Sequence, residues 1–131
     1  MRDSKLGYFD WKIVADGVVE VSVSAGVELK GEHIAKAFGL VKAAMPKYFC
    51  VLAHRHESYS HTLESMIVLS DIEEILLYAV VVSNTEQREL GRSHRMINPK
   101  VQLFGMREDA LQACIQRVKD NHKKLAKYSK S

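Results

Sequence analysis

The chain has 131 residues and a formal net charge of +3, and 47% of its residues are hydrophobic and 27% charged. This length and composition predict one globular domain that buries a core of its own. No apolar run reaches the roughly 18 residues that a membrane-spanning helix needs, and residues 1–11 (MRDSKLGYFDW) lack the apolar centre of a secretion signal. We therefore expect a cytoplasmic protein with no membrane span.

The positive charge is concentrated at the C-terminal end. Residues 119–131 (KDNHKKLAKYSKS) contain five lysines and one aspartate, so residues 1–118 carry 14 positive and 15 negative charges. We predict a single domain over 1–118, followed by a basic tail or helix extension at 119–131. No aromatic RNA-binding motif or helix-turn-helix pattern accompanies these lysines, so we expect no binding of nucleic acid.

The first predicted element is a hairpin. Residues 8–15 (YFDWKIVA) mix aromatic and β-branched side chains, and valines recur at alternate positions in 18–24 (VVEVSVS). Asp16 and Gly17 lie between these segments, and Gly17 can adopt the positive φ that a tight turn requires. We therefore predict two antiparallel strands.

A helical crossover then leads to a third strand. Residues 31–45 carry an apolar stripe at helical spacing that includes Phe38, and Pro46 ends this helix. The apolar segment 47–54 (KYFCVLAH) follows as a buried strand. Because a helix joins them, we expect this strand to lie parallel to the strand at 18–24.

The rest of the chain alternates between helices and strands. The cysteines, Cys50 and Cys114, fall at predicted core positions without CxxC spacing, which indicates packing roles in a reducing compartment. The predicted segments are a polar stretch at 55–61, a helix at 62–77, a strand at 78–84, a helix at 85–97, a strand at 101–105 and a helix at 107–118. A break of the helix at Ser70 and Asp71 is an alternative, because serine and aspartate cap helices better than they continue them.

Together these elements predict an α/β fold in the order β-β-α-β-α-β-α-β-α. About five strands form a mixed sheet, which is mainly parallel after the antiparallel first strand and is covered by about four helices. We expect Phe38, Val51, Val81 and Leu111 to be buried in its core.

This organisation resembles the STAS domain, the anti-sigma-factor-antagonist fold, and within it the SpoIIAA-like (STAS/SEC14-type) bacterial proteins. The resemblance covers about residues 8–118. It is carried by the Asp-Gly hairpin, by the strands YFCVLAH (48–54) and YAVVVSN (78–84), and by VQLFGMREDALQAC (101–114).

The resemblance implies a non-enzymatic regulatory or protein-interaction module with an unknown protein partner. Its SEC14-type side implies an alternative, which is the binding of a lipid or another small apolar ligand in a cavity beside the sheet. A homodimer remains an open alternative for the assembly. The sequence contains no G-x-S-x-G, P-loop or dinucleotide-binding signature, so we expect no enzymatic activity and no cofactor.

The predicted partner or ligand surface lies at the carboxyl edge of the sheet, where ligands bind in parallel α/β folds. In regulatory STAS domains a serine or threonine at the start of a helix is phosphorylated. The resemblance places Thr62 at that position, although His61 replaces an acidic residue and no glycine follows. The alternative, which we favour, is that the Thr62 hydroxyl caps the helix. The full predicted surface comprises Ser58, Tyr59, Ser60, His61, Thr62, Arg88 and Arg92.

The same segment is rich in histidine. His54, His56 and His61 could supply three nitrogen ligands to a metal ion, and a metal-dependent enzyme at this loop is our second alternative. A solvated loop with incidental histidines is the interpretation that we favour, because an HxH pair without a second spaced motif is a weak signal. We therefore expect no bound metal.

Overall fold

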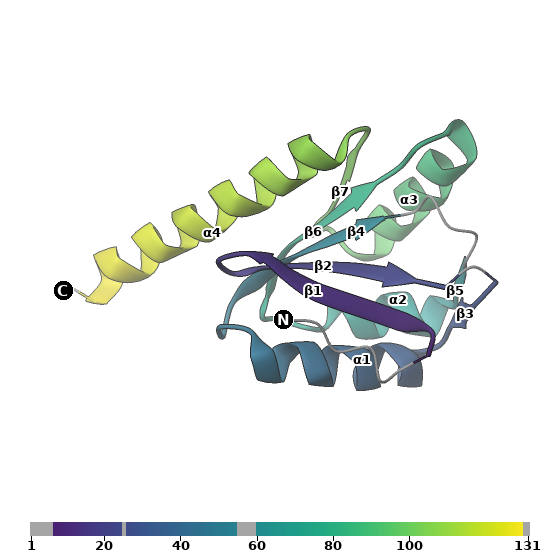
Figure 1. The fold of residues 1–131 in the computed structure, drawn as a ribbon, viewed down its shortest axis with the longest axis horizontal. Coiled ribbons are helices and arrows are strands. Elements are labelled where there is room, and N and C mark those ends of the chain that lie inside the picture. The colour runs from purple at the N-terminus through teal and green to yellow at the C-terminus, as the bar shows by residue number, and fades with distance from the viewer. Residues whose placement is uncertain (1–6, 25, 55–59, 130–131) are drawn as a thin grey trace.

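A computed structural model describes residues 7–24, 26–54 and 60–129 (Figure 1). Its main sheet has five strands in the spatial order β1-β2-β4-β6-β7, and a second, small parallel sheet pairs β3 with β5. The strands are β1 (Phe9–Ala15), β2 (Val18–Val23), β3 (Glu28–Leu29), β4 (Phe49–His54), β5 (Ser60–His61), β6 (Ile75–Val81) and β7 (Val101–Phe104). The helices are α1 (Gly31–Ala44), α2 (Leu63–Ser70), α3 (Thr85–Ile97) and α4 (Arg107–Ser129).

The helices cover the two faces of the sheet unequally. α1, α2 and α3 lie on one face, where Ile34, Phe38 and Val41 of α1 pack against the aromatic side chains of β1. α4 crosses the opposite face, mainly over β4 and β6 (Figure 1). Its contact side chains are small, since Ala110, Cys114 and Val118 are the ones it buries.

The hairpin forms as predicted. β1 pairs antiparallel with β2, and Gly17 adopts a φ of +72° in the turn between them. β2 also pairs in parallel with β4, so it lies between β1 and β4. The predicted position of the strand at 18–24 is therefore confirmed.

The predicted helix at 62–77 is wrong in its second half, and the alternative of a break at Ser70 and Asp71 is confirmed. α2 ends at Ser70, and β6 begins at Ile75, three residues before the strand predicted at 78. Ile75 and Leu77 pair with β4 at the centre of the sheet, where both side chains are buried. Burial between two layers outweighs the helical propensity of leucine in this segment.

The predicted core is partly correct. Phe38 and Val51 are buried. Val81 and Leu111 are only half-buried, because both lie at the margin of the contact between α4 and the sheet, where they pack against the buried residues from outside.

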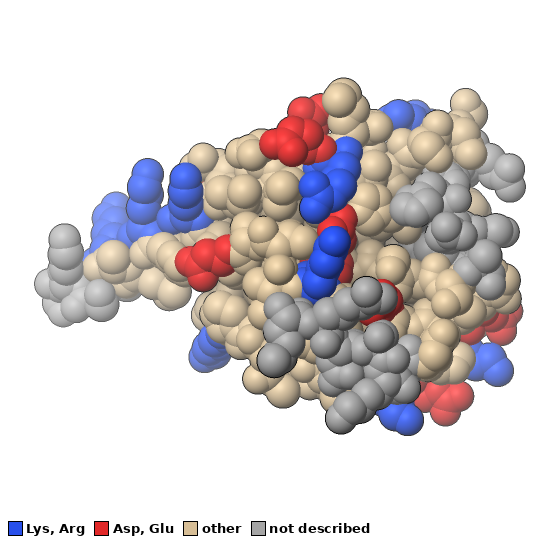
Figure 2. All heavy atoms as spheres, in the orientation of Figure 1, with Lys and Arg blue, Asp and Glu red and all other residues tan. Residues whose placement is uncertain are grey.

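α4 continues well beyond the sheet. After Val118 its described side chains are exposed, except for the half-buried Asn121. Figure 1 shows this end of α4 projecting from the domain, and Figure 2 shows basic side chains gathered on it. Among the described residues, no helix combines the length and the apolar character that crossing a membrane would require.

Candidate functional site

The predicted surface is organised around the start of α2. The Thr62 hydroxyl accepts a hydrogen bond from the backbone N–H of Ser65 (3.1 Å), so Thr62 is the N-cap of this helix. The Thr62 backbone N–H donates to the Leu29 carbonyl (2.9 Å), which ties the cap to the small β3–β5 sheet. The helix start is therefore held in place by backbone and side-chain bonds together.

The structure describes the other residues of the predicted surface to different extents. Ser58 and Tyr59 lie outside the described residues, and for Ser60 and His61 only the backbone of β5 is described. Arg88 and Arg92 are exposed on α3, where Arg92 forms an ion pair with Glu89. Arg88 lies on the side of α3 that faces Gly105, since a Cβ atom added to Gly105 would be 4.0 Å from its Nη2 atom.

Exposed apolar side chains accompany these residues. Leu63 and Ile67 of α2 are 62% and 45% exposed, and Leu90 of α3 is 49% exposed. Leu63 and Ile67 are one helical turn apart and so share a side of α2, and α2 contacts α3. This feature could not be predicted from the sequence, because nothing local marks Leu63 as an exposed leucine.

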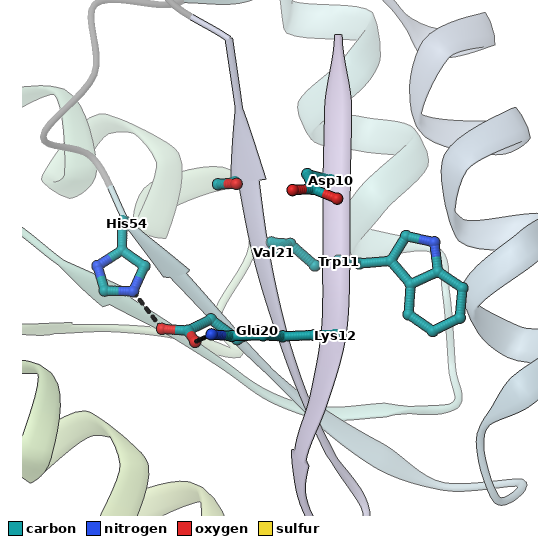
Figure 3. Close-up of a pocket in the computed structure, with 7 residues that line it drawn as sticks. Asp10, Trp11, Lys12, Glu20, Val21 and His54 are labelled. Carbon is teal, nitrogen blue, oxygen red and sulfur yellow. Dashed lines mark hydrogen bonds and ion pairs between the residues drawn. The ribbon is translucent and has the colours of Figure 1, made fainter. Parts of the chain in front are cut away.

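A second polar cluster lies on the α4 side of the sheet, around Glu20 of β2 (Figure 3). The His54 ring donates from Nε2 to Glu20 Oε2 (2.5 Å), and the Lys12 ammonium lies 3.7 Å from Oε1. Arg107, at the start of α4, donates from Nε to Oε2 (2.7 Å) and from Nη2 to Oε1 (3.2 Å). One carboxylate thus connects β1, β2, β4 and α4.

Glu20 is ionised in this cluster. Its burial raises the pKa of the carboxyl, but the hydrogen bonds from Arg107 and His54 outweigh that effect and lower the pKa to about 2. The same bond raises the pKa of Arg107. Only 9% of Glu20 is exposed, so its charge depends on these partners for compensation.

A pocket of about 280 Å³ opens beside the cluster. Figure 2 shows acidic and basic side chains alternating in a band from the start of α4 across the face formed by β1 and β2. The residues that line the pocket are Asp10, Trp11, Lys12, Glu20, Val21, Ser22 and His54. Of these residues, only His54 is a candidate site residue predicted from the sequence.

The structure gives His54 a carboxylate partner and not the neighbours that the metal alternative requires. Its Nε2 atom faces Glu20, His56 lies outside the described residues, and the side chain of His61 is likewise not described. Within the described part of the chain, no group of three or more His, Cys, Asp or Glu side chains is placed to hold a metal ion. The expectation of no bound metal stays a prediction.

The fold is similar to that of a solved structure. A crystal structure of an uncharacterised protein of the DUF3478 family from Shewanella loihica PV-4, described as having a SpoIIAA-like fold, matches with a TM-score of 0.61 and 16% sequence identity. The match covers 86% of this chain and 98% of that one. No family model matches the chain, and no curated protein matches it either.

This likeness confirms the predicted fold class. The chain has a SpoIIAA-like fold, in which the described residues form a mixed main sheet of five strands, with one antiparallel pair, and four helices. At 16% identity the likeness concerns the fold alone.

Proposed function

We propose that the chain is a non-enzymatic, STAS-like interaction module of the bacterial cytoplasm, which binds a protein partner at the carboxyl edge of its sheet. The proposed contact region, named here the α2–α3 surface, consists of Thr62, Leu63, Ile67, Arg88, Leu90 and Arg92. The observation that carries the proposal is the exposure of Leu63, Ile67 and Leu90 on two adjacent helices.

These side chains suit a protein interface. Covering an exposed leucine is worth roughly 1.5–3 kcal/mol, and exposed apolar residues with a polar rim are typical of contact sites. Arginine is enriched among the residues that dominate binding energy. Arg88 and Arg92 are both exposed and lie one turn apart on α3, on the flank of the helix opposite Leu90. The surface therefore combines exposed apolar side chains on α2 and α3 with two arginines on the other flank of α3.

Thr62 supplies a means of regulation. It directly precedes Leu63, so a phosphate on its hydroxyl would place about two negative charges beside the most exposed leucine of the surface. A partner that covered Leu63 would also remove water from this charged phosphate, and that desolvation costs free energy. Phosphorylation at Thr62 would therefore weaken binding, as the family resemblance implies.

The pocket beside Glu20 does not suit the apolar-ligand alternative. Besides Trp11 and Val21, its lining includes two carboxylates, an ammonium, an imidazole and a hydroxyl, and such charged groups are unfavourable neighbours for a lipid tail. The protein partner could also be a second copy of this chain. The mass of the protein in solution, measured in the test below, identifies such a homodimer.

The test compares two exposed leucines. Leu63→Ser removes part of the α2–α3 surface, and the matched control Leu125→Ser changes an exposed leucine on the projecting end of α4. Each variant is used as bait in a lysate of the organism that encodes the chain, and its mass is measured in solution. We expect Leu63→Ser alone to lose a captured protein or a dimer. Equal capture and equal mass for both variants would contradict the proposal.

A further inference from the structure

The C-terminal end of α4 extends past the sheet. Ala110, Cys114 and Val118, the side chains that α4 buries, repeat at every fourth position on its sheet-facing side. After Val118 the described side chains are exposed, apart from the half-buried Asn121. Figure 1 shows this segment projecting clear of the other elements. It therefore presents its outward side chains to any surface that approaches that end of the molecule.

Four lysines lie on the outward side of this segment. Lys119, Lys123 and Lys127 repeat at every fourth position, so they form a row along the helix, and Lys124 lies beside it. At about 3.6 residues per turn, this row lies opposite the side that packs on the sheet. Figure 2 shows the basic side chains standing out from this end of the molecule. These four residues are named here the α4 lysine row.

The charges of the row are not balanced within the described chain. None of the four lysines forms an ion pair with another described residue. Asp120 is the only acidic residue of 119–131, and its carboxylate accepts a hydrogen bond from Gln116 (2.9 Å). Like charges four residues apart on a helix repel one another. Contact with a negatively charged surface would relieve this repulsion.

The residue type selects the kind of surface. Residues 119–131 contain five lysines and no arginine. Arginine is the residue that holds nucleic-acid phosphates and bases by paired hydrogen bonds, and lysine is depleted at protein interfaces. Lysine carries a compact, hydrated charge that requires no fixed partner geometry. A lysine cluster of this size on a helix is typical of segments that bind anionic lipid headgroups.

We propose that the α4 lysine row holds the chain at a membrane surface rich in anionic phospholipid. The lipid phosphates attract the four ammonium groups, and α4 lies along the headgroups without entering the apolar layer. Leu125, a large exposed apolar side chain of this segment, lies on the opposite side of the helix from the row and does not insert. Each lysine near an anionic membrane strengthens binding by about fivefold.

The row and the α2–α3 surface lie on opposite faces of the sheet (Figure 1). This inference therefore does not depend on the proposed function.

The first test uses the unaltered full-length chain. It is mixed with sucrose-loaded vesicles of phosphatidylcholine, either alone or with about one third phosphatidylglycerol, and the bound fraction is measured by sedimentation. We expect binding to the anionic vesicles alone. Raising the salt from about 0.05 M to about 0.5 M should weaken this binding at least about tenfold, because the ions screen the attraction.

The second test moves the position of a charge loss. Lys123→Gln with Lys127→Gln removes two charges from the row, and the matched control, Lys36→Gln with Lys47→Gln, removes two exposed lysines on and just after α1. Both double variants have the same net charge. We expect the row variant to bind anionic vesicles at least about tenfold more weakly, and the control to bind them as the wild-type chain does.

Two further measurements address other modes of binding. Leu125→Ser tests insertion of the opposite side of α4, and we expect it to bind the vesicles as the wild-type chain does. Duplex DNA, added to the vesicle-bound chain at an equal concentration of phosphate groups, tests the nucleic-acid alternative. We expect most of the chain to remain with the vesicles.

Three results would overturn the inference. One is the absence of binding to anionic vesicles at the lower salt. Another is an equal loss of binding in the two lysine variants, or a loss in Leu125→Ser. The last is transfer of the chain from the vesicles to the DNA. Circular dichroism of each variant verifies that the helices remain folded, and the first measurement needs no substitution.

Discussion

Arg107 donates two hydrogen bonds to Glu20, a residue 87 positions earlier in the chain, and so attaches the start of α4 to β2. The side chains that α4 buries are few and small. Among the described residues, its other hydrogen bond to the sheet from a charged side chain is the one that Arg117 donates to the Leu76 carbonyl (3.2 Å). Charge-assisted bonds of this kind contribute about 1.5–3 kcal/mol. Because Arg107 is 42% exposed, water screens part of that contribution.

We therefore expect Arg107→Met to lower the free energy of unfolding by about 1–2 kcal/mol. The measurement is a double-mutant cycle with Glu20→Gln, made by urea denaturation at neutral pH. The two changes should be coupled by about 1 kcal/mol, because each removes the same interaction. Strictly additive effects would show that the two side chains stabilise the fold independently.

Glu20 also predicts how stability depends on pH. Its carboxyl pKa is about 2 in the folded chain, against an ordinary value of 4.5, so the folded state favours the ionised form. The resulting stabilisation is fully present above pH 4.5 and is lost as the pH falls towards 2. After allowance for solvent, it amounts to about 2 kcal/mol.

The measurement compares the wild-type chain with Glu20→Gln between pH 7 and pH 2.5, by chemical denaturation at about constant ionic strength. The stability difference between the two proteins should be nearly constant down to about pH 4.5 and then shrink. If the difference is the same at both ends of the range, the low pKa of Glu20 is not a property of the folded chain.

The hairpin turn gives a prediction about packing. Gly17 has a φ of +72°, and a Cβ atom added there would lie 3.0 Å from Cγ1 of Val118 on α4. Gly17→Ala should therefore cost about 1–3 kcal/mol, through the unfavourable φ and the close contact together. The double variant with Val118→Ala separates the two effects, because only the contact is relieved. Melting of Gly17→Ala at the wild-type temperature would contradict this account of the turn.

The sequence predicted features whose signals are local. Asp16 and Gly17 between alternating valines determine the hairpin, and Thr62 before a helical segment has the chemistry of an N-cap. The extent of β6 was harder to predict, because Ile75 to Leu77 suit either a helix or a buried strand until β4 is known to lie beside them.

The Glu20 cluster could not be predicted from spacing. Its members come from four elements, and His54 and Arg107 lie 34 and 87 positions from Glu20. The one available signal was a single glutamate within a strand of valines, VVEVSV, where a buried charge requires a partner. The sequence gives no indication of which cation that partner is.

The central claim, partner binding at the α2–α3 surface, is tested most directly at Thr62. Asparagine and aspartate both cap helices well, so Thr62→Asn and Thr62→Asp should each preserve the bond to the Ser65 N–H and melt near the wild-type temperature. Only Thr62→Asp adds a negative charge beside Leu63. A glutamate at position 62 would add the same charge but is a poorer variant for this test, because its longer side chain is not a favoured N-cap.

The decisive measurement is the amount of partner captured by these two variants, with the wild-type chain and Leu125→Ser as references. We predict that Thr62→Asn captures the partner as the wild-type chain does. Thr62→Asp should lose most of the capture at an unchanged melting temperature. Equal capture by Thr62→Asp and Thr62→Asn would contradict the claim that the α2–α3 surface is the interface.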